Sequence, residues 1–156
     1  MNEIEKKFIV YNLPIYIKKN LIKTHTLKQN YIDLKIIKLR LRKYINANNQ
    51  LLTIKFGKGL VRKELELNIS NKIYKLLSNL TNKKPIIKKR EVYKLNDNYL
   101  IECDIFIKPN KNYYLCEIEF SSKTEANNFT TPNWLKNEVT GIDKYTNEYI
   151  WIDYNS

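Results

Sequence analysis

Hydrophobic and polar residues alternate with a period of two along most of the chain, a pattern that predicts β-strands. The runs are separated by short stretches rich in Asn, Pro or Gly, which favour turns. We expect a hairpin around Gly57 and Gly59, because glycine supplies the positive φ that tight turns need. The predicted strands span residues 3–10, 30–44, 50–57, 60–69, 86–95, 98–107, 112–121 and 149–154.

Helical periodicity is confined to fewer segments. Residues 70–82 open with Ser70, a residue type suited to capping a helix. The apolar residues of this segment fall on one helical face: Ile73, Leu76, Leu77 and Leu80. Residues 121–129 and 133–145 are further helical candidates. This order of elements indicates an α+β fold with a largely antiparallel sheet, and the lack of any linker or repeat predicts a single domain over residues 1–156.

Composition narrows the class of protein. Hydrophobic residues make up 43% of the 156 residues, which is typical of a folded globular chain. The net charge of +12 predicts an anionic partner, such as a phosphate compound, a nucleic acid or a membrane surface. The charged start and the absence of a long apolar run predict neither a signal peptide nor a membrane span. With only two cysteines, the expected location is the reducing cytoplasm.

The charged residues of the predicted strands gather on one face of each strand. Half-solvated sheets commonly have one polar face, so a single strand of this kind carries little information. However, arginines recur in this set, and its acids come in Glu-x-Glu doublets that repel each other across about 7 Å. The residues on this face are Glu3, Glu5, Lys7, Arg40, Arg42, Lys55, Arg62, Glu64, Glu66, Lys88, Arg90, Glu102, Asp104, Glu117 and Glu119.

A sheet that curls into a barrel with its charged face inward would explain both features. The acids and bases would then pair, and metal ions and a polyanion would fill the remaining space. The apolar face would point outward beneath the helices, with Cys103 and Cys116 buried on it as structural thiols. His25 lies in a polar stretch and is expected on the surface rather than as a ligand.

At these residues the chain resembles the CYTH family, the triphosphate tunnel metalloenzymes, in its short single-domain bacterial form. The ExExK signature of the family matches Glu3-Ile4-Glu5-Lys6-Lys7. The resemblance continues through "LRLRK", "LTIK", "VRKELEL", "KKR", "IECDIF" and "LCEIEF". It ends in "PNWLKNEVTGIDKYTN", which is similar to the P-x-W, E-V-T and Y-x-N elements of the family.

The resemblance implies an eight-stranded antiparallel closed β-barrel, or tunnel, with a charged lumen and helices packed outside. It also implies roles for the charged residues. Glu3, Glu5 and Lys7 become the catalytic candidates. The metal-binding acids would be Glu3, Glu5, Asp104, Glu117 and Glu119. The phosphate-binding bases would be Lys7, Arg40, Arg42, Lys55, Arg62, Lys88, Arg90 and Lys144, of which Lys144 replaces a frequent Arg. Supporting acids would be Glu64, Glu66 and Glu102.

Carboxylate ligands suit one or two Mg²⁺ or Mn²⁺ ions, which prefer oxygen donors. The expected function is metal-dependent hydrolysis of inorganic tripolyphosphate to pyrophosphate and orthophosphate. Either Glu3 or Glu5, or a second metal ion, would activate the attacking water, and the sequence leaves this choice open.

Other functions remain open at this stage. Nucleoside triphosphates, thiamine triphosphate or RNA 5′ ends present the same head group, and class IV adenylyl cyclases share the fold. A non-enzymatic module that binds RNA or polyphosphate is a further alternative, although it leaves the paired acids unexplained. The expected partner is a triphosphate-containing small molecule rather than a membrane or a nucleic acid, and the expected state is a monomer or a homodimer.

Overall fold

The fold is known from a computed structural model that describes residues 2–33, 38–56 and 61–156. Its strands are β1 (Asn2–Val10), β2 (Leu21–Asp33), β3 (Lys38–Tyr44), β4 (Asn49–Phe56), β5 (Val61–Asn68), β6 (Ile86–Lys94), β7 (Leu100–Lys108), β8 (Tyr114–Glu119) and β9 (Asn137–Glu138). Its helices are α1 (Ile15–Lys18), α2 (Asn71–Ser78), α3 (Lys123–Asn128) and α4 (Asn147–Tyr154), with 3₁₀ turns η1 (Asn133–Leu135) and η2 (Asp143–Tyr145). Within these described segments, no helix combines the length and the apolar character of a membrane span.

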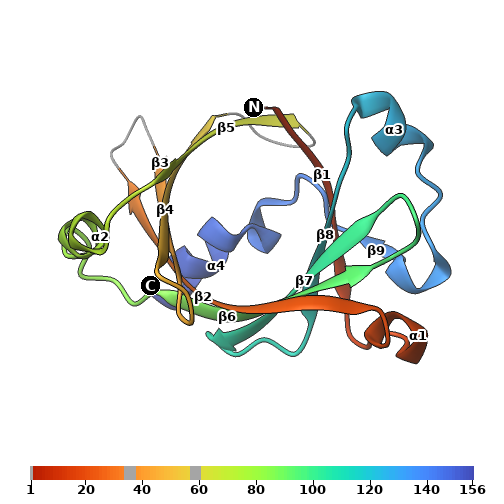
Figure 1. Cartoon of the computed structure of the whole chain (residues 1–156), viewed down its shortest axis with the longest axis horizontal. Helices are drawn as coiled ribbons and strands as arrows, with labels where there is room; N and C mark the ends of the chain where they lie inside the picture. The colour runs from red at the N-terminus through yellow and green to blue at the C-terminus, as the bar shows by residue number, and fades with distance from the viewer. Residues whose placement is uncertain (1, 34–37, 57–60) are drawn as a thin grey trace.

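The strands form one antiparallel sheet in the order β5-β4-β3-β2-β6-β7-β8-β1-β9. In addition, the start of β1 pairs with β5, where Glu3 lies opposite Arg62 and Ile4 opposite Val61. Figure 1 shows the strands curving around a ring, with β5 and β1 side by side at its top. The predicted α+β class and the antiparallel sheet are therefore confirmed.

Two predicted strands were wrong. Residues 30–33 of the first of these belong to β2, which starts at Leu21, and residues 38–44 form a separate strand, β3, which pairs with β2. The sequence between them, "LKII", contains no turn-forming residue, so the alternation reads as continuous. Residues 149–154 lie in α4, because alternating residues of so short a segment do not separate a strand from a buried helix.

Two of the three predicted helical segments contain a helix. Ser70 caps α2 by accepting a hydrogen bond from the backbone N–H of Ile73. Ser122 caps α3 in the same way, through the N–H of Glu125. By contrast, residues 133–145 are not one helix, since they contain η1, β9 and η2. The predicted hairpin at Gly57 and Gly59 lies outside the described residues.

The apolar face of the sheet points outward and is covered in two places. Under α1 and α3, the buried cluster contains Phe8, Leu13, Ile17, Cys103, Cys116 and Ile118, among others. Under α2, Tyr74 packs against Ile32 and Leu41. These two layers are the outer cores that the alternation predicts, and they force the charged residues of the same strands to the inner face.

Helix α4 is the exception, because it packs against the inner face. Its Ile150 and Trp151 share a buried cluster with Tyr31, Ile9, Phe106 and Leu115. Ile9, Phe106 and Leu115 each lie two residues from a charged residue and therefore on the same, inner face of their strands. The indole N–H of Trp151 donates to Oδ1 of Asn30 at 2.7 Å. In Figure 1, α4 is seen within the opening of the ring. The expectation that all helices pack outside was therefore wrong for α4, which fills part of the interior with apolar side chains.

We predict that Trp151→Phe lowers the free energy of unfolding by about 1–3 kcal/mol, because it leaves the buried Asn30 side chain without its indole donor. Urea unfolding followed by circular dichroism measures the change. As a control, Tyr149→Phe alters an exposed ring on the same helix and should change the stability by less than about 0.5 kcal/mol. Equal stabilities of the two variants would contradict this role of Trp151.

Candidate active site

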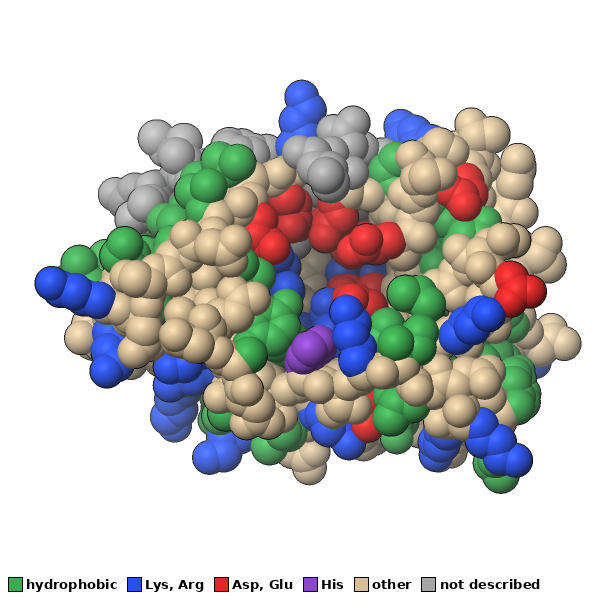
Figure 2. Space-filling view, viewed as in Figure 1, with side chains coloured by type: hydrophobic (Ala, Val, Ile, Leu, Met, Phe, Trp, Pro, Cys, Tyr) green, Lys and Arg blue, Asp and Glu red, His purple; other side chains and the backbone are tan. Residues whose placement is uncertain are grey.

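The inner face of the sheet surrounds a cavity of about 1260 Å³. Figure 2 shows it as a hollow with acidic side chains along one rim and basic side chains deeper inside. Residues of β1, β2, β3, β5, β6, β7 and β8 line it, together with α4 and the segment before it. The alternation of the strands thus delivers charged side chains from opposite sides of the ring into one space.

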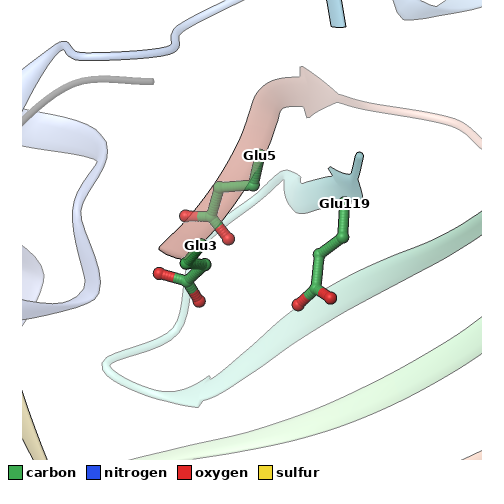
Figure 3. Close-up of side chains that lie close together, drawn as sticks. All are labelled: Glu3, Glu5 and Glu119. Carbon is green, nitrogen blue, oxygen red and sulfur yellow. The ribbon is translucent and has the colours of Figure 1, made fainter. Parts of the chain in front are cut away.

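Three carboxylates form a cluster at this cavity. Glu3 and Glu5 come from β1, and Glu119 ends β8 opposite Glu5 in the strand register. One oxygen from each lies within 4.8 Å of the others, and all three side chains project to the same side (Figure 3). Burial, followed by the charges of Glu102 and Glu3, raises the pKa of Glu119 above its ordinary value. A cation would relieve this repulsion, and an all-oxygen site fits hard divalent ions such as Mg²⁺ or Mn²⁺.

Next to this cluster lies a dense ion-pair network centred on Arg90. Its guanidinium contacts both oxygens of Asp104 at 2.7 Å and Oε2 of Glu117 at 3.0 Å, and it also pairs with Glu102. Lys7 pairs with Glu117 and with Oε1 of Glu5, the latter at 2.7 Å. Burial opposes ionisation of Glu117, but Lys7 and Arg90 outweigh it and hold the pKa of this carboxyl well below its ordinary value. Glu117 is therefore ionised, and Lys7 and Arg90 neutralise its charge.

Lys88 is fully buried beside this network. Its ammonium donates to Asp104 and, at 2.9 Å, to Oδ1 of Asn147 at the start of α4. Burial lowers the pKa of Lys88 to about 7, against the opposing effect of Asp104. Burial also disfavours the charged form of Asp104, but Arg90 and Lys88 overcome it and lower the pKa of Asp104.

The two arginines of β3 differ in their partners. Arg40 contacts Thr53 at 3.2 Å and reaches Glu64 and Glu66 at 3.4 and 3.5 Å. Arg42 is 8% exposed, and no carboxylate among the described residues lies within ion-pair distance of it. Its buried Nε also lacks a hydrogen-bond partner within the described part of the chain. Burial, then the charges of Arg40 and Arg90, lowers the pKa of Arg42. Arg42 is thus a buried cation that an incoming anion would stabilise.

Most of the residues singled out from the sequence meet in this cavity. Lys55 and Arg62 lie on β4 and β5 at positions described by their backbone alone, with Lys55 opposite Glu64 and Arg62 opposite Glu3. Lys144 lies apart from the set: it is exposed, and its ammonium sits 4.8 Å from the ring centre of Tyr145.

Several residues that line the cavity were not predicted from the sequence. Tyr31 and His25 lie on β2, a strand that the alternation largely missed. His25, which was expected on the surface, is half-buried at the cavity and packs edge-on against Tyr44, with 5.2 Å between the ring centres. Glu148 of α4 pairs with Lys38 at 2.5 Å. Nothing in the sequence places a C-terminal helix inside the ring, so Asn147 and Glu148 could not be identified from the pattern.

Residues 138–140, near the C-terminal end of the chain, hold β1 in place. The backbone N–H of Lys7 donates to Oγ1 of Thr140 at 3.0 Å, and the N–H of Val139 donates to the carbonyl of Lys7 at 2.8 Å. Lys6 pairs with Glu138 on the outer side of the strand. The segment that resembles the family's E-V-T element thus fixes the strand that carries Glu5 and Lys7.

The cavity places an acidic cluster opposite buried bases, an arrangement whose charges suit a metal ion and a polyanion. The chain is 31% identical to an inorganic triphosphatase of Nitrosomonas europaea over 148 residues, which cover 95% of each chain. It is also 31% identical to an inorganic triphosphatase of Acetivibrio thermocellus over 149 residues, 93% of this chain and 90% of that one. No family model matches.

Solved structures of other proteins share this fold. A crystal structure of an inorganic triphosphatase, 31% identical, superposes with a TM-score of 0.68 and covers 96% of this chain and 97% of that one. A protein from Pyrococcus horikoshii, 24% identical, shares the fold with a TM-score of 0.58 over 80% of this chain and 83% of its own. The chain belongs to the CYTH family of triphosphate tunnel metalloenzymes.

We predict that Lys88 makes stability depend on pH. Below about pH 7 Lys88 is protonated in both states, so its contribution is constant. Between about pH 7 and 10.5 the unfolded chain holds the proton more tightly than the folded one, so the free energy of unfolding rises with pH, by up to about 1.4 kcal/mol per unit.

The measurement is urea unfolding between pH 7.5 and 9 in EDTA, with Lys88→Met as the control that lacks the titrating amine. The stability of the native protein should rise relative to that of Lys88→Met across this range. Parallel pH profiles would show that Lys88 keeps an ordinary pKa.

Proposed function

We propose that this protein hydrolyses a triphosphate in a metal-dependent reaction, and that the substrate is inorganic tripolyphosphate, cleaved to pyrophosphate and orthophosphate. The observation that carries the proposal is Arg42, a buried guanidinium beside Arg40 and Arg90 that has no acid partner in the described chain. Burying like charges together is unfavourable unless an anion joins them. Both curated relatives are named inorganic triphosphatases, which supports the same substrate here.

The arrangement of the bases suits a phosphate chain. A guanidinium can contact two phosphate oxygens at once, so Arg42 and the outer edge of Arg40 would hold one end of the substrate. At an effective dielectric of 20, a charge pair at 4 Å is worth about 4 kcal/mol, so a few such contacts give strong binding. Lys7 and Lys88 would complete the set, and we include Lys55, Arg62 and Arg90 because their strands face the same space.

The acids would serve the metal. Glu3, Glu5 and Glu119 offer clustered oxygens, and Mg²⁺ or Mn²⁺ bound there would neutralise charge on the phosphate oxygens. Asp104 and Glu117 remain candidate ligands, although their present ion pairs with Arg90 mean that they also orient bases. Glu64, Glu66 and Glu102 would support the arginines in the same manner.

The hydrolytic step requires a water molecule in line with the scissile P–O bond. The water oxygen would attack the terminal phosphorus while Glu3 or Glu5 accepts its proton, and the pyrophosphate would leave along the row of bases. Lys7 would position Glu5, since its ammonium lies 2.7 Å from Oε1 of this residue. The pairing of β1 with β5 supports a sheet that closes into a tunnel, and α4 would seal the end opposite to the substrate's entrance.

We predict that Arg42→Gln lowers kcat/KM for tripolyphosphate by about 10- to 100-fold, because it removes a charged hydrogen-bonding partner of the phosphates. Phosphate release with Mg²⁺ or Mn²⁺ measures the rate, and EDTA should abolish it. Lys28→Gln is the matched control, since it removes an exposed base of β2. Unchanged hydrolysis by Arg42→Gln, or metal-independent hydrolysis, would overturn the proposal.

A further inference from the structure

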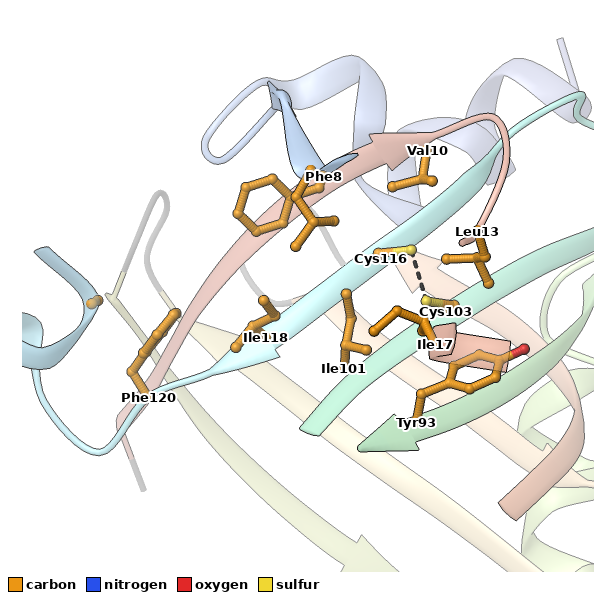
Figure 4. Close-up of a cluster of buried hydrophobic side chains, with 12 residues drawn as sticks. Phe8, Val10, Leu13, Ile17, Tyr93, Ile101, Cys103, Cys116, Ile118 and Phe120 are labelled. Carbon is orange, nitrogen blue, oxygen red and sulfur yellow. Dashed lines mark hydrogen bonds between the residues drawn. The ribbon is translucent and has the colours of Figure 1, made fainter. Parts of the chain in front are cut away.

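Cys103 and Cys116, the chain's two cysteines, face each other on the outer side of the sheet. They are direct partners in the register of β7 and β8. Their sulfur atoms lie 2.8 Å apart, and both side chains are fully buried and in the free thiol form (Figure 4). Neither sulfur lies in the charged cavity, so the proposed hydrolysis does not involve this pair.

The register that places Cys103 opposite Cys116 is compatible with a disulfide. Directly opposite residues of antiparallel strands have Cα atoms about 4.5 or 5.5 Å apart, within the roughly 4.4–6.8 Å that disulfides span. We propose that Cys103 and Cys116 form an oxidisable dithiol site, which closes to an intrachain disulfide without a change in strand register.

Access to the sulfurs depends on α1. Leu13 and Ile17 belong to the buried cluster that encloses the thiols, and they lie next to the sulfurs in Figure 4. Helix α1 has only four residues and no side-chain cap, and its Ile15 and Tyr16 are 72% and 59% exposed. So short a helix is held by few contacts and opens locally at a small cost in free energy. Opening of α1 therefore admits the oxidant.

The oxidant is a small two-electron acceptor of the peroxide class. One thiol sulfur attacks a peroxide oxygen, which gives a sulfenic acid and releases water. The second thiol then attacks the sulfenic sulfur, forms the S–S bond and releases a second water. Two thiols and one hydrogen peroxide thus become one disulfide and two waters.

The disulfide ties together the strands that carry Glu102, Asp104 and Glu117 on their inner side. Because the strands keep their register, these acids keep their positions and hydrolysis continues. The closed loop restricts the unfolded chain, so the oxidised protein should melt roughly 5–10 °C higher.

The test treats the full-length protein with hydrogen peroxide and counts thiols after denaturation. We expect two thiols to fall to none, a mass loss of two hydrogens, a monomeric band without reductant, a higher Tm, and full reversal by dithiothreitol. Cys103→Val and Cys116→Val, two separate variants, should show no rise in Tm. Persistent thiols, a crosslinked dimer or a lower Tm would each overturn the proposal, and none of these readouts depends on phosphate hydrolysis.

The access route has its own test. Ile17→Ala should speed disulfide formation at least about tenfold, because it weakens the packing of α1 over the sulfurs. Leu41→Ala removes a similar side chain beneath α2, far from the thiols, and should leave the rate close to that of the native protein. Equal acceleration by both variants would show that oxidation requires global unfolding instead.

Discussion

The structure depends on neutralising charges that have been taken out of water. Arg90 lies at the centre of this balance, because Nε and Nη2 of its guanidinium bind the two oxygens of Asp104 and the same group also reaches Glu117 and Glu102. Burial opposes the ionisation of Asp104 and Glu117, and their contacts with Arg90 overcome this penalty. The acids cannot be read solely as metal ligands, since several of them hold the bases in place before any substrate arrives.

Two places in the cavity point to the same chemistry. The acids at Glu3, Glu5 and Glu119 crowd each other, while Arg42 lies among other guanidinium groups. A divalent cation would satisfy the first place and a polyphosphate the second. The fold separates the two by placing the acidic cluster on β1 and β8 and Arg42 on β3, so that a bound triphosphate would bridge them. Helix α4 fills the interior beyond Tyr31 and confines the polar chemistry to the remaining space.

Much of this arrangement could be predicted from the sequence, since period-two alternation assigns each charged residue to a face. That rule placed Arg40 and Arg42 inward, and Cys103 and Cys116 outward, as the structure shows. It failed at β2, because "LKII" offers no turn residue and because the run from Leu21 to Gln29 is largely polar. It also failed at α4, whose residues pack inside a ring that forms only when distant strands have paired. Tertiary packing of this kind depends on distant residues, so no local sequence pattern predicts it.

Our central claim is that Glu3, Glu5 and Glu119 would bind the metal ion, while Arg42 would bind the phosphates. A crystal structure with Mn²⁺ and a non-hydrolysable triphosphate analogue, with the metal located by anomalous scattering, tests it most directly. We predict a metal peak bounded by Glu3, Glu5 and Glu119, with phosphate oxygens against the guanidinium of Arg42. A metal bound elsewhere, or an analogue that leaves Arg42 uncontacted, would contradict it.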